Sequence, residues 1–194
     1  RLKPNDAEFN ANLGNSLFSL GDYASALMYY ENALSINPKC PKVFNSIGNV
    51  YAAEGKLSDS LNFFKKAIIL KPDFFGAHNN IANILKELGE YQEALKHYDR
   101  AIALDATFSD SFYNKANLLV KLNKHSEALE YYQTALKLNN MFLDCYLNMG
   151  NCLRDQGNLV QAIEAYKAAL KIDPSFSDAS LNLGLVKLKM TCWS

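Results

Sequence analysis

The sequence predicts an all-α fold, a right-handed superhelical solenoid of antiparallel helix pairs with five full repeats and a terminal helix. The first reason is a strict period of 34 residues along the 194-residue chain. A small residue recurs at position 8 of each repeat, at Gly14, Gly48, Ala82, Ala116, Gly150 and Gly184. The second reason is an alanine at position 27, at Ala33, Ala67, Ala101, Ala135 and Ala169. Repeats of this kind stack on their neighbours and bury one continuous core.

The repeats divide the whole chain into one array, predicted to span residues 1–194. Counting from position 8 gives repeats 7–40, 41–74, 75–108, 109–142 and 143–176, followed by a C-terminal capping helix 177–190. Residues 1–6 are expected to be the end of a preceding repeat, because Leu2-Lys3-Pro4 has the same phase as Leu70-Lys71-Pro72. We therefore expect the chain to be a segment of a longer array, with targeting signals and attached domains outside it.

Two helices fit in each repeat, and single residues define their ends. The first helix is expected to end at position 15, with residues that accept a left-handed backbone: Gly21, Gly55, Gly89, Asn123 and Gly157. The second helix carries an aromatic ring at position 24: Tyr30, Phe64, Tyr98, Tyr132 and Tyr166. Small residues let the two helix axes approach, and the ring fills the gap beside them. Proline ends the second helix at Pro38, Pro72 and Pro174.

At these residues the chain resembles the tetratricopeptide repeat (TPR) family. The family pattern is met by Ile47-Gly48-x2-Tyr51, by Ala94-x3-Tyr98 and by the closing Pro72. Pentatricopeptide, HEAT and armadillo repeats have longer units and fit less well. The chain departs from the pattern at position 7 of the fourth repeat, where Lys115 replaces an apolar residue. The resemblance implies a binding scaffold whose first helices line a concave face.

Asparagine dominates two positions that face this concave surface in TPR arrays. Position 6 carries Asn12, Asn80, Asn114, Asn148 and Asn182, and position 9 carries Asn15, Asn49, Asn83, Asn117 and Asn151. Asn45 and Asn79 extend the same surface. Asparagine is a poor helix former, about 0.5 kcal/mol worse than alanine at each site. Its amide both donates and accepts hydrogen bonds, so a row of amides is suited to hold the backbone of an extended peptide.

Two readings of this asparagine ladder remain open from the sequence. In one, the amides bind a peptide; in the other, they hydrate the concave face or bridge adjacent helices and fix the superhelical twist. The pattern is similar to the TPR region of O-linked N-acetylglucosamine transferases, in which such a ladder engages the substrate backbone. The peroxisomal targeting-signal receptor also uses concave asparagines. A clamp for chaperone C-termini is disfavoured, because it needs cations at positions 2, 5 and 6 and position 2 offers only Lys42.

The C-terminal end of the predicted groove is apolar. Five concave positions carry Tyr113, Leu147, Leu181, Leu185 and Leu188. An exposed apolar cluster usually marks a contact site. The alternative is that the tail, including Trp193, or a following repeat covers it.

Composition and motifs exclude most other functions. Lys plus Arg equals Asp plus Glu at 20 each, so no net charge favours nucleic acid or an anionic membrane. No phosphate-binding loop, nucleophile elbow or metalloprotease motif is present. His78, His97 and His125 occupy different positions of the repeat, so no metal or base constellation is expected. We expect no cofactor, no metal and no catalytic residue, and the chain is not expected to be an enzyme.

Four cysteines lack the spacing of a zinc site or a disulfide framework. Cys145 and Cys152 lie two turns apart on one helical face and are interpreted as packing residues. Reduced thiols indicate an intracellular protein, cytoplasmic or nuclear.

Three functions follow from these observations. The first is a protein–protein interaction module that binds an extended peptide or an unstructured protein segment through the asparagine ladder. The second is the substrate-recruiting region of a larger glycosyltransferase. The third is a scaffold or self-associating module, with a homo-oligomer formed through the apolar C-terminal end.

Overall fold

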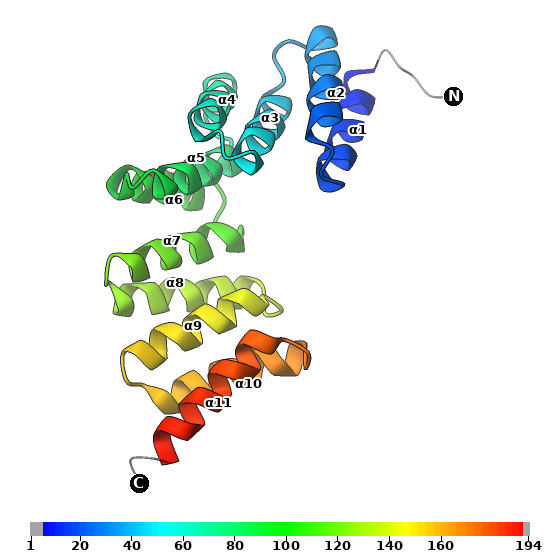
Figure 1. The fold of residues 1–194 in the computed structure, drawn as a ribbon. Helices are drawn as coiled ribbons and strands as arrows, with labels where there is room; N and C mark the ends of the chain where they lie inside the picture. The colour runs from blue at the N-terminus through cyan, green and yellow to red at the C-terminus, as the bar shows by residue number, and fades with distance from the viewer. Residues whose placement is uncertain (1–5, 192–194) are drawn as a thin grey trace. The chain divides into compact units, whose positions relative to one another are not determined.

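The protein is described by a computed structural model whose helices follow one another as hairpins (Figure 1). The described residues are 6–191, and this part of the chain contains eleven α-helices and no strand. The helices are α1 Ala7–Ser19, α2 Tyr23–Ile36, α3 Pro41–Ala53, α4 Leu57–Leu70, α5 Phe75–Glu87, α6 Tyr91–Leu104, α7 Ser109–Lys121, α8 His125–Leu138, α9 Leu143–Asp155, α10 Leu159–Ile172 and α11 Ser177–Thr191. The predicted all-α class of paired helices is confirmed. Leu2-Lys3-Pro4, Cys192 and Trp193 lie outside the described residues.

The helices form two compact units, residues 1–104 and 105–194, here called the N-terminal unit and the C-terminal unit. The N-terminal unit contains the pairs α1–α2, α3–α4 and α5–α6. The C-terminal unit contains α7–α8 and α9–α10, and α11 packs on α10. The single array predicted over residues 1–194 stays a prediction.

Left-handed residues end the first helices, as the sequence predicted. Asn123 follows α7 with a φ of 58°, in the place where Gly89 follows α5 with a φ of 82°. The Asn123 amide donates to the carbonyl of Val120, and the Lys124 amide donates to the carbonyl of Leu119, both at 2.9 Å. These two bonds satisfy carbonyls that a helix end otherwise leaves without partners. Asparagine therefore substitutes for glycine here without changing the turn.

The core of each helix pair is a buried ring packed against a small residue. Tyr166 of α10 is fully buried, and its Cε1 would lie 2.5 Å from a Cβ added to Gly150 of α9. Phe64 lies equally close to Gly48 in the pair α3–α4. The contact at position 8 thus leaves no room for a side chain in these pairs, which explains why glycine stands there.

A second ring contact joins position 4 of the first helix to position 23 of the second. Phe112 and Tyr131 pack in this way, with ring centroids 6.3 Å apart. Lys115 is buried beside them; its Nζ donates to the Tyr131 hydroxyl at 2.6 Å and lies 4.1 Å from the ring centroid. The lysine that breaks the family pattern therefore has a hydroxyl and a ring face as partners.

Candidate functional site

The position 9 asparagines are tied to the tyrosine of their own repeat. The hydroxyl of Tyr166 donates to Oδ1 of Asn151 at 2.9 Å, and that of Tyr132 donates to Oδ1 of Asn117 at 2.5 Å. The same bond joins Tyr30 to Asn15 and Tyr98 to Asn83. In these four helix pairs the buried tyrosine therefore fixes the position of the amide beside it, whereas the second repeat has Phe64 and lacks this bond.

Oδ1 of the position 9 residue also accepts a bond from position 6 of the next repeat. Nδ2 of Asn80 donates to Oδ1 of Asn49 at 3.1 Å, within the N-terminal unit. In the C-terminal unit, Nδ2 of Asn148 donates to Asn117 and Nδ2 of Asn182 donates to Asn151. These bonds connect the first helices of adjacent repeats, so the ladder does have the bridging role that the sequence left open.

Position 5 adds to this network, and the accessibility of the ladder varies. Asn80 also donates to Oδ1 of Asn45 at 3.0 Å, and Asn148 donates to the hydroxyl of Tyr113 at 2.9 Å. Asn79 of α5 is buried, with only 5% of it exposed. The other ladder residues are reachable from solvent: Asn12 and Asn15 are exposed, and Asn45, Asn49, Asn80, Asn83, Asn114, Asn117, Asn148, Asn151 and Asn182 are partly exposed.

The bridging bonds use only one end of each amide. They use Oδ1 of the position 9 residue and Nδ2 of the position 6 residue. The opposite atoms, such as Nδ2 of Asn117 and Oδ1 of Asn148, take no part in these bonds. A row of this kind presents both donors and acceptors, the two groups that an extended peptide backbone needs.

The ladder borders a hollow in each unit. In the N-terminal unit, a hollow of about 510 Å³ has Asp6, Asn12, Asn15, Lys42 and Ser46 among its lining residues. In the C-terminal unit, a hollow of about 240 Å³ is lined by residues of α7, α8 and α9: Asn117, Val120, Tyr132, Asn148, Asn151, Cys152 and Asp155. Ladder amides therefore line a hollow in each unit.

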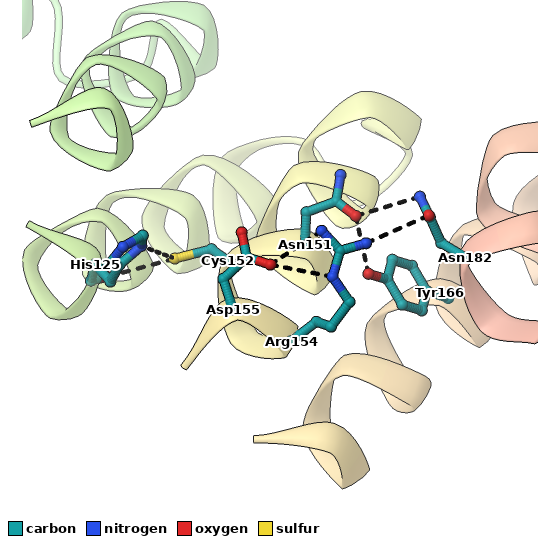
Figure 2. A network of polar contacts seen from close by, with 7 residues as sticks. All are labelled: His125, Asn151, Cys152, Arg154, Asp155, Tyr166 and Asn182. Atoms are coloured by element: carbon teal, nitrogen blue, oxygen red, sulfur yellow. Dashed lines mark hydrogen bonds and ion pairs between the residues drawn. The ribbon is translucent and has the colours of Figure 1, made fainter. Parts of the chain in front are cut away.

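Figure 2 shows that Arg154 joins the ladder in the C-terminal unit. Its guanidinium pairs with Asp155 at 3.0 Å and donates to Oδ1 of Asn182 at 3.4 Å. Sequence reasoning did not name Arg154. The signal was its place at position 12, one of the concave positions of the repeat.

The thiol of Cys152 lies beside the ladder and is buried. Figure 2 shows it next to His125, whose Nδ1 is 3.5 Å from the sulfur, and the thiol donates to the carbonyl of His125. Burial, with a smaller contribution from Asp155, raises the pKa of Cys152 to about 11. The thiol is therefore protonated at neutral pH, in agreement with a packing role.

The apolar residues at the C-terminal end differ in exposure. Tyr113 and Leu147 are half-buried, whereas Leu181, Leu185 and Leu188 of α11 are 64%, 52% and 62% exposed. Residues 181, 185 and 188 follow helical spacing, so these leucines form one stripe on α11. The alternative that the tail covers these leucines involves Trp193, which lies outside the described part of the chain.

Two histidines come together in the structure, a contact that the sequence did not predict. His78 of α5 and His97 of α6 both belong to the third repeat, and their Nδ1 atoms lie 3.0 Å apart. Nε2 of His78 lies 3.1 Å from the carbonyl of Pro72, which assigns a proton to that nitrogen. The pair occupies positions 4 and 23, where the fourth repeat has Phe112 and Tyr131. The positions of the two residues along their helices did not reveal this contact, because it joins α5 to α6 and depends on how the two helices pack.

This histidine pair predicts a loss of stability in acid. Burial, followed by the charge of His78 and opposed by Glu93, lowers the pKa of His97 from 6.5; Lys65 lowers it further. The unfolded chain therefore binds more protons at this residue than the folded chain does. The contribution of His97 to folding stability is thus present above about pH 6.5 and is lost as the pH falls. We expect the urea midpoint to fall between about pH 7.5 and pH 5.5. The double variant His78→Phe/His97→Phe copies the ring pair of the second repeat and should lose much of this pH dependence; an equal fall in both proteins would contradict the assignment.

Within residues 6–191 no group of three or more His, Cys, Asp or Glu side chains is arranged to hold a metal ion. In the same range, no helix is long and apolar enough to cross a membrane.

Two family models match the sequence over most of its length. One, described as "Tetratricopeptide repeat", matches residues 7–40, 76–108 and 109–142. The other, described as "TPR repeat", matches residues 48–89 and 150–190. No curated protein matches the sequence.

Several solved structures share the fold. TTC0263, a thermophilic TPR protein of Thermus thermophilus, is 19% identical over 94% of this chain and 99% of that chain, with a TM-score of 0.77. YrrB, described as a TPR protein with an unusual peptide-binding site, is 22% identical over 90% of each chain, with a TM-score of 0.65. MamA is 22% identical over 88% of this chain and 93% of its own, with a TM-score of 0.69. At these identities the likeness concerns the fold alone.

Proposed function

The chain belongs to the tetratricopeptide repeat family, and from that premise we propose that its asparagine ladder binds an extended peptide or an unstructured segment of a protein partner. TPR repeats are interaction scaffolds and are generally not catalytic. The observation that carries the proposal is that the two ends of each ladder amide have different roles. One end is held by a tyrosine or a neighbouring asparagine, which positions the other end for a guest.

The fixed geometry favours binding over simple hydration. Asn117 accepts from both Tyr132 and Asn148, so its side chain has few rotamers left to lose when a guest arrives. A guest carbonyl accepts from Nδ2 of the position 9 residue, and a guest amide donates to Oδ1 of the position 6 residue. Contacts of this kind address the backbone and depend little on the side chains of the guest.

The apolar stripe of α11 is proposed to bind apolar side chains of the same guest. Leu181, Leu185 and Leu188 are more than half exposed, and Tyr113 and Leu147 occupy the position in their repeats that Leu181 occupies in α11. The peptide-binding site described for YrrB supports a peptide guest for this fold.

The test keeps the internal bonds and removes only the outward donors. Asn117→Asp/Asn151→Asp preserves an oxygen for Tyr132 and Tyr166 but replaces Nδ2 by a second oxygen. Peptides selected from a random library on the full chain are titrated by calorimetry. We expect the double variant to bind at least about tenfold more weakly, the effect of roughly one to two lost hydrogen bonds.

The matched control is Asn139→Asp/Asn158→Asp, which adds the same charge in exposed turns away from the ladder. It should bind like the wild type. Methylating the backbone nitrogens of the selected peptide should abolish binding, whereas single alanine substitutions in it should not. Equal affinity of the ladder variant and the control contradicts the proposal.

The ladder also supports a more specific role, the substrate-recruiting region of a larger glycosyltransferase of the O-linked N-acetylglucosamine type. The supporting observation is asparagine at positions 6 and 9 in successive repeats. A parent chain that continues into a glycosyltransferase domain is the expected result, and a parent chain without one contradicts this role. Self-association through α11 is the further alternative, and a mass that rises with concentration in light scattering would favour it.

A further inference from the structure

The fifth repeat lacks a ring that the other four repeats carry. Position 23 is aromatic in repeats one to four, at Tyr29, Phe63, His97 and Tyr131. The fifth repeat has Ala165 at this position, and Ala165 is 3% exposed. The difference removes a whole ring from one helix pair.

The earlier repeats show where that ring belongs. In the second repeat, Phe63 packs on Phe44 at position 4 and on Tyr51 at position 11, with centroid distances of 6.4 and 5.2 Å. The third and fourth repeats keep the contact between positions 4 and 23. In three successive repeats a ring on the second helix therefore lies against a ring on the first.

In the fifth repeat the same place is a hollow. Tyr146 at position 4, Leu153 at position 11 and Ala165 at position 23 all line a pocket of about 390 Å³. Leu129 of α8, Met149 of α9 and Ala168 of α10 complete its apolar wall. All of these residues belong to the C-terminal unit. The pocket therefore has the walls of the ring site but not the ring.

We propose that this pocket binds an aromatic side chain of a protein partner, which packs on Tyr146 in place of the missing ring. The site corresponds to a ring contact that the second, third and fourth repeats already contain. Gln133, Gln161 and Glu164 stand at its polar margin. Glu164 is the charged residue among them. Its negative charge disfavours a guest with an anionic group next to the ring and favours one in which the neighbouring groups are neutral or cationic.

The pocket is lined by nine residues, a site for one side chain of a partner. The lining residues include none of the ladder asparagines, so this site is distinct from the proposed peptide groove. Failure of peptide binding at the ladder therefore leaves this inference standing.

The first experiment titrates the full chain with p-cresol, the side chain of tyrosine as a free molecule. The Met149 methyl signal in NMR is expected to shift, with a dissociation constant of roughly 1 mM for one buried ring. Ala165→Phe should fill the pocket, weaken p-cresol binding at least about tenfold and raise the thermal midpoint. 4-Hydroxyphenylacetate, which is anionic, should bind more weakly than p-cresol.

A second arm separates a partner side chain from a small molecule. A capped Gly-Tyr-Gly peptide should shift the same methyl signal, and Gly-Ala-Gly should not. Binding of p-cresol without the tyrosine peptide overturns the proposal of a protein partner. Absence of any shift at Met149 overturns the site itself.

A gain-of-function variant tests the proposal even if Ala165→Phe fails to fold. Phe63→Ala deletes the equivalent ring in the second repeat, leaving the walls Phe44 and Tyr51. This variant is expected to bind a second equivalent of p-cresol. If it gains none while folded, position 23 is not the determinant of ring binding.

Discussion

Replacing Tyr132 by alanine is expected to lower the stability of the C-terminal unit by about 3–5 kcal/mol. The ring is 1% exposed and fills the space between α7 and α8, so its loss removes buried apolar contacts and leaves a cavity. It also removes the hydroxyl that donates to Asn117. The change is measured as the free energy of unfolding in urea, with circular dichroism and an NMR probe in the C-terminal unit, because repeat arrays need not unfold in one step.

The hydroxyl is tested separately by a reciprocal pair of substitutions. Tyr132→Phe keeps the ring and removes only the bond to Asn117, so we expect a loss of about 1 kcal/mol. The second repeat has Phe64 at the same position, and Asn49 there accepts from Asn80 without a tyrosine hydroxyl. Phe64→Tyr should therefore be neutral or stabilising. If Tyr132→Phe costs as much as Tyr132→Ala, the ring is not the main source of stability.

Replacing Gly150 by valine is expected to cost about 1–3 kcal/mol or more, because the added atoms meet the buried Tyr166 ring. A Cβ at residue 150 would lie 2.5 Å from Cε1 of that ring, closer than real contacts allow. Either α9 or α10 must then move, and the bond between Tyr166 and Asn151 moves with it. The measurement is the urea midpoint together with the NMR signals of α9 and α10.

Gly184 provides a matched control in the same register. A Cβ added there would meet nothing within 4 Å, because the described helices include none that covers this face of α11. Gly184→Val should thus be neutral or slightly stabilising, since valine favours a helix over glycine by a few tenths of a kcal/mol, up to about 0.5. Gly150→Ala should lie between the two, because Ala82 and Ala116 show that the register accepts a methyl group. Equal effects of valine at residues 150 and 184 would contradict the ring contact.

The ladder illustrates how far sequence reasoning reaches. The period alone places asparagines at positions 6 and 9 of successive repeats. It does not identify the hydrogen-bond partners of Asn148. Its bond to Asn117 joins residues 31 apart in the sequence, and its bond to Tyr113 joins residues 35 apart. Hydrogen bonds of about 3 Å depend on the rotation and approach of two helices, which a periodic pattern does not encode. Asn79 shows the same limit, because its position suggested a groove amide and its side chain is buried.

The sequence by itself determined the repeat, the helix pairs and the place of each buried ring, because helix ends and apolar spacing are local properties. It marked Asn123 as a helix end and Gly150 as a close approach before any packing was known. Only the tertiary structure decided which side chains meet across the pairs: Lys115 with Tyr131, His78 with His97, and an open pocket beside Tyr146. Those contacts depend on how two helices pack, and a single exchange such as Ala165 for a ring changes them without altering the repeat.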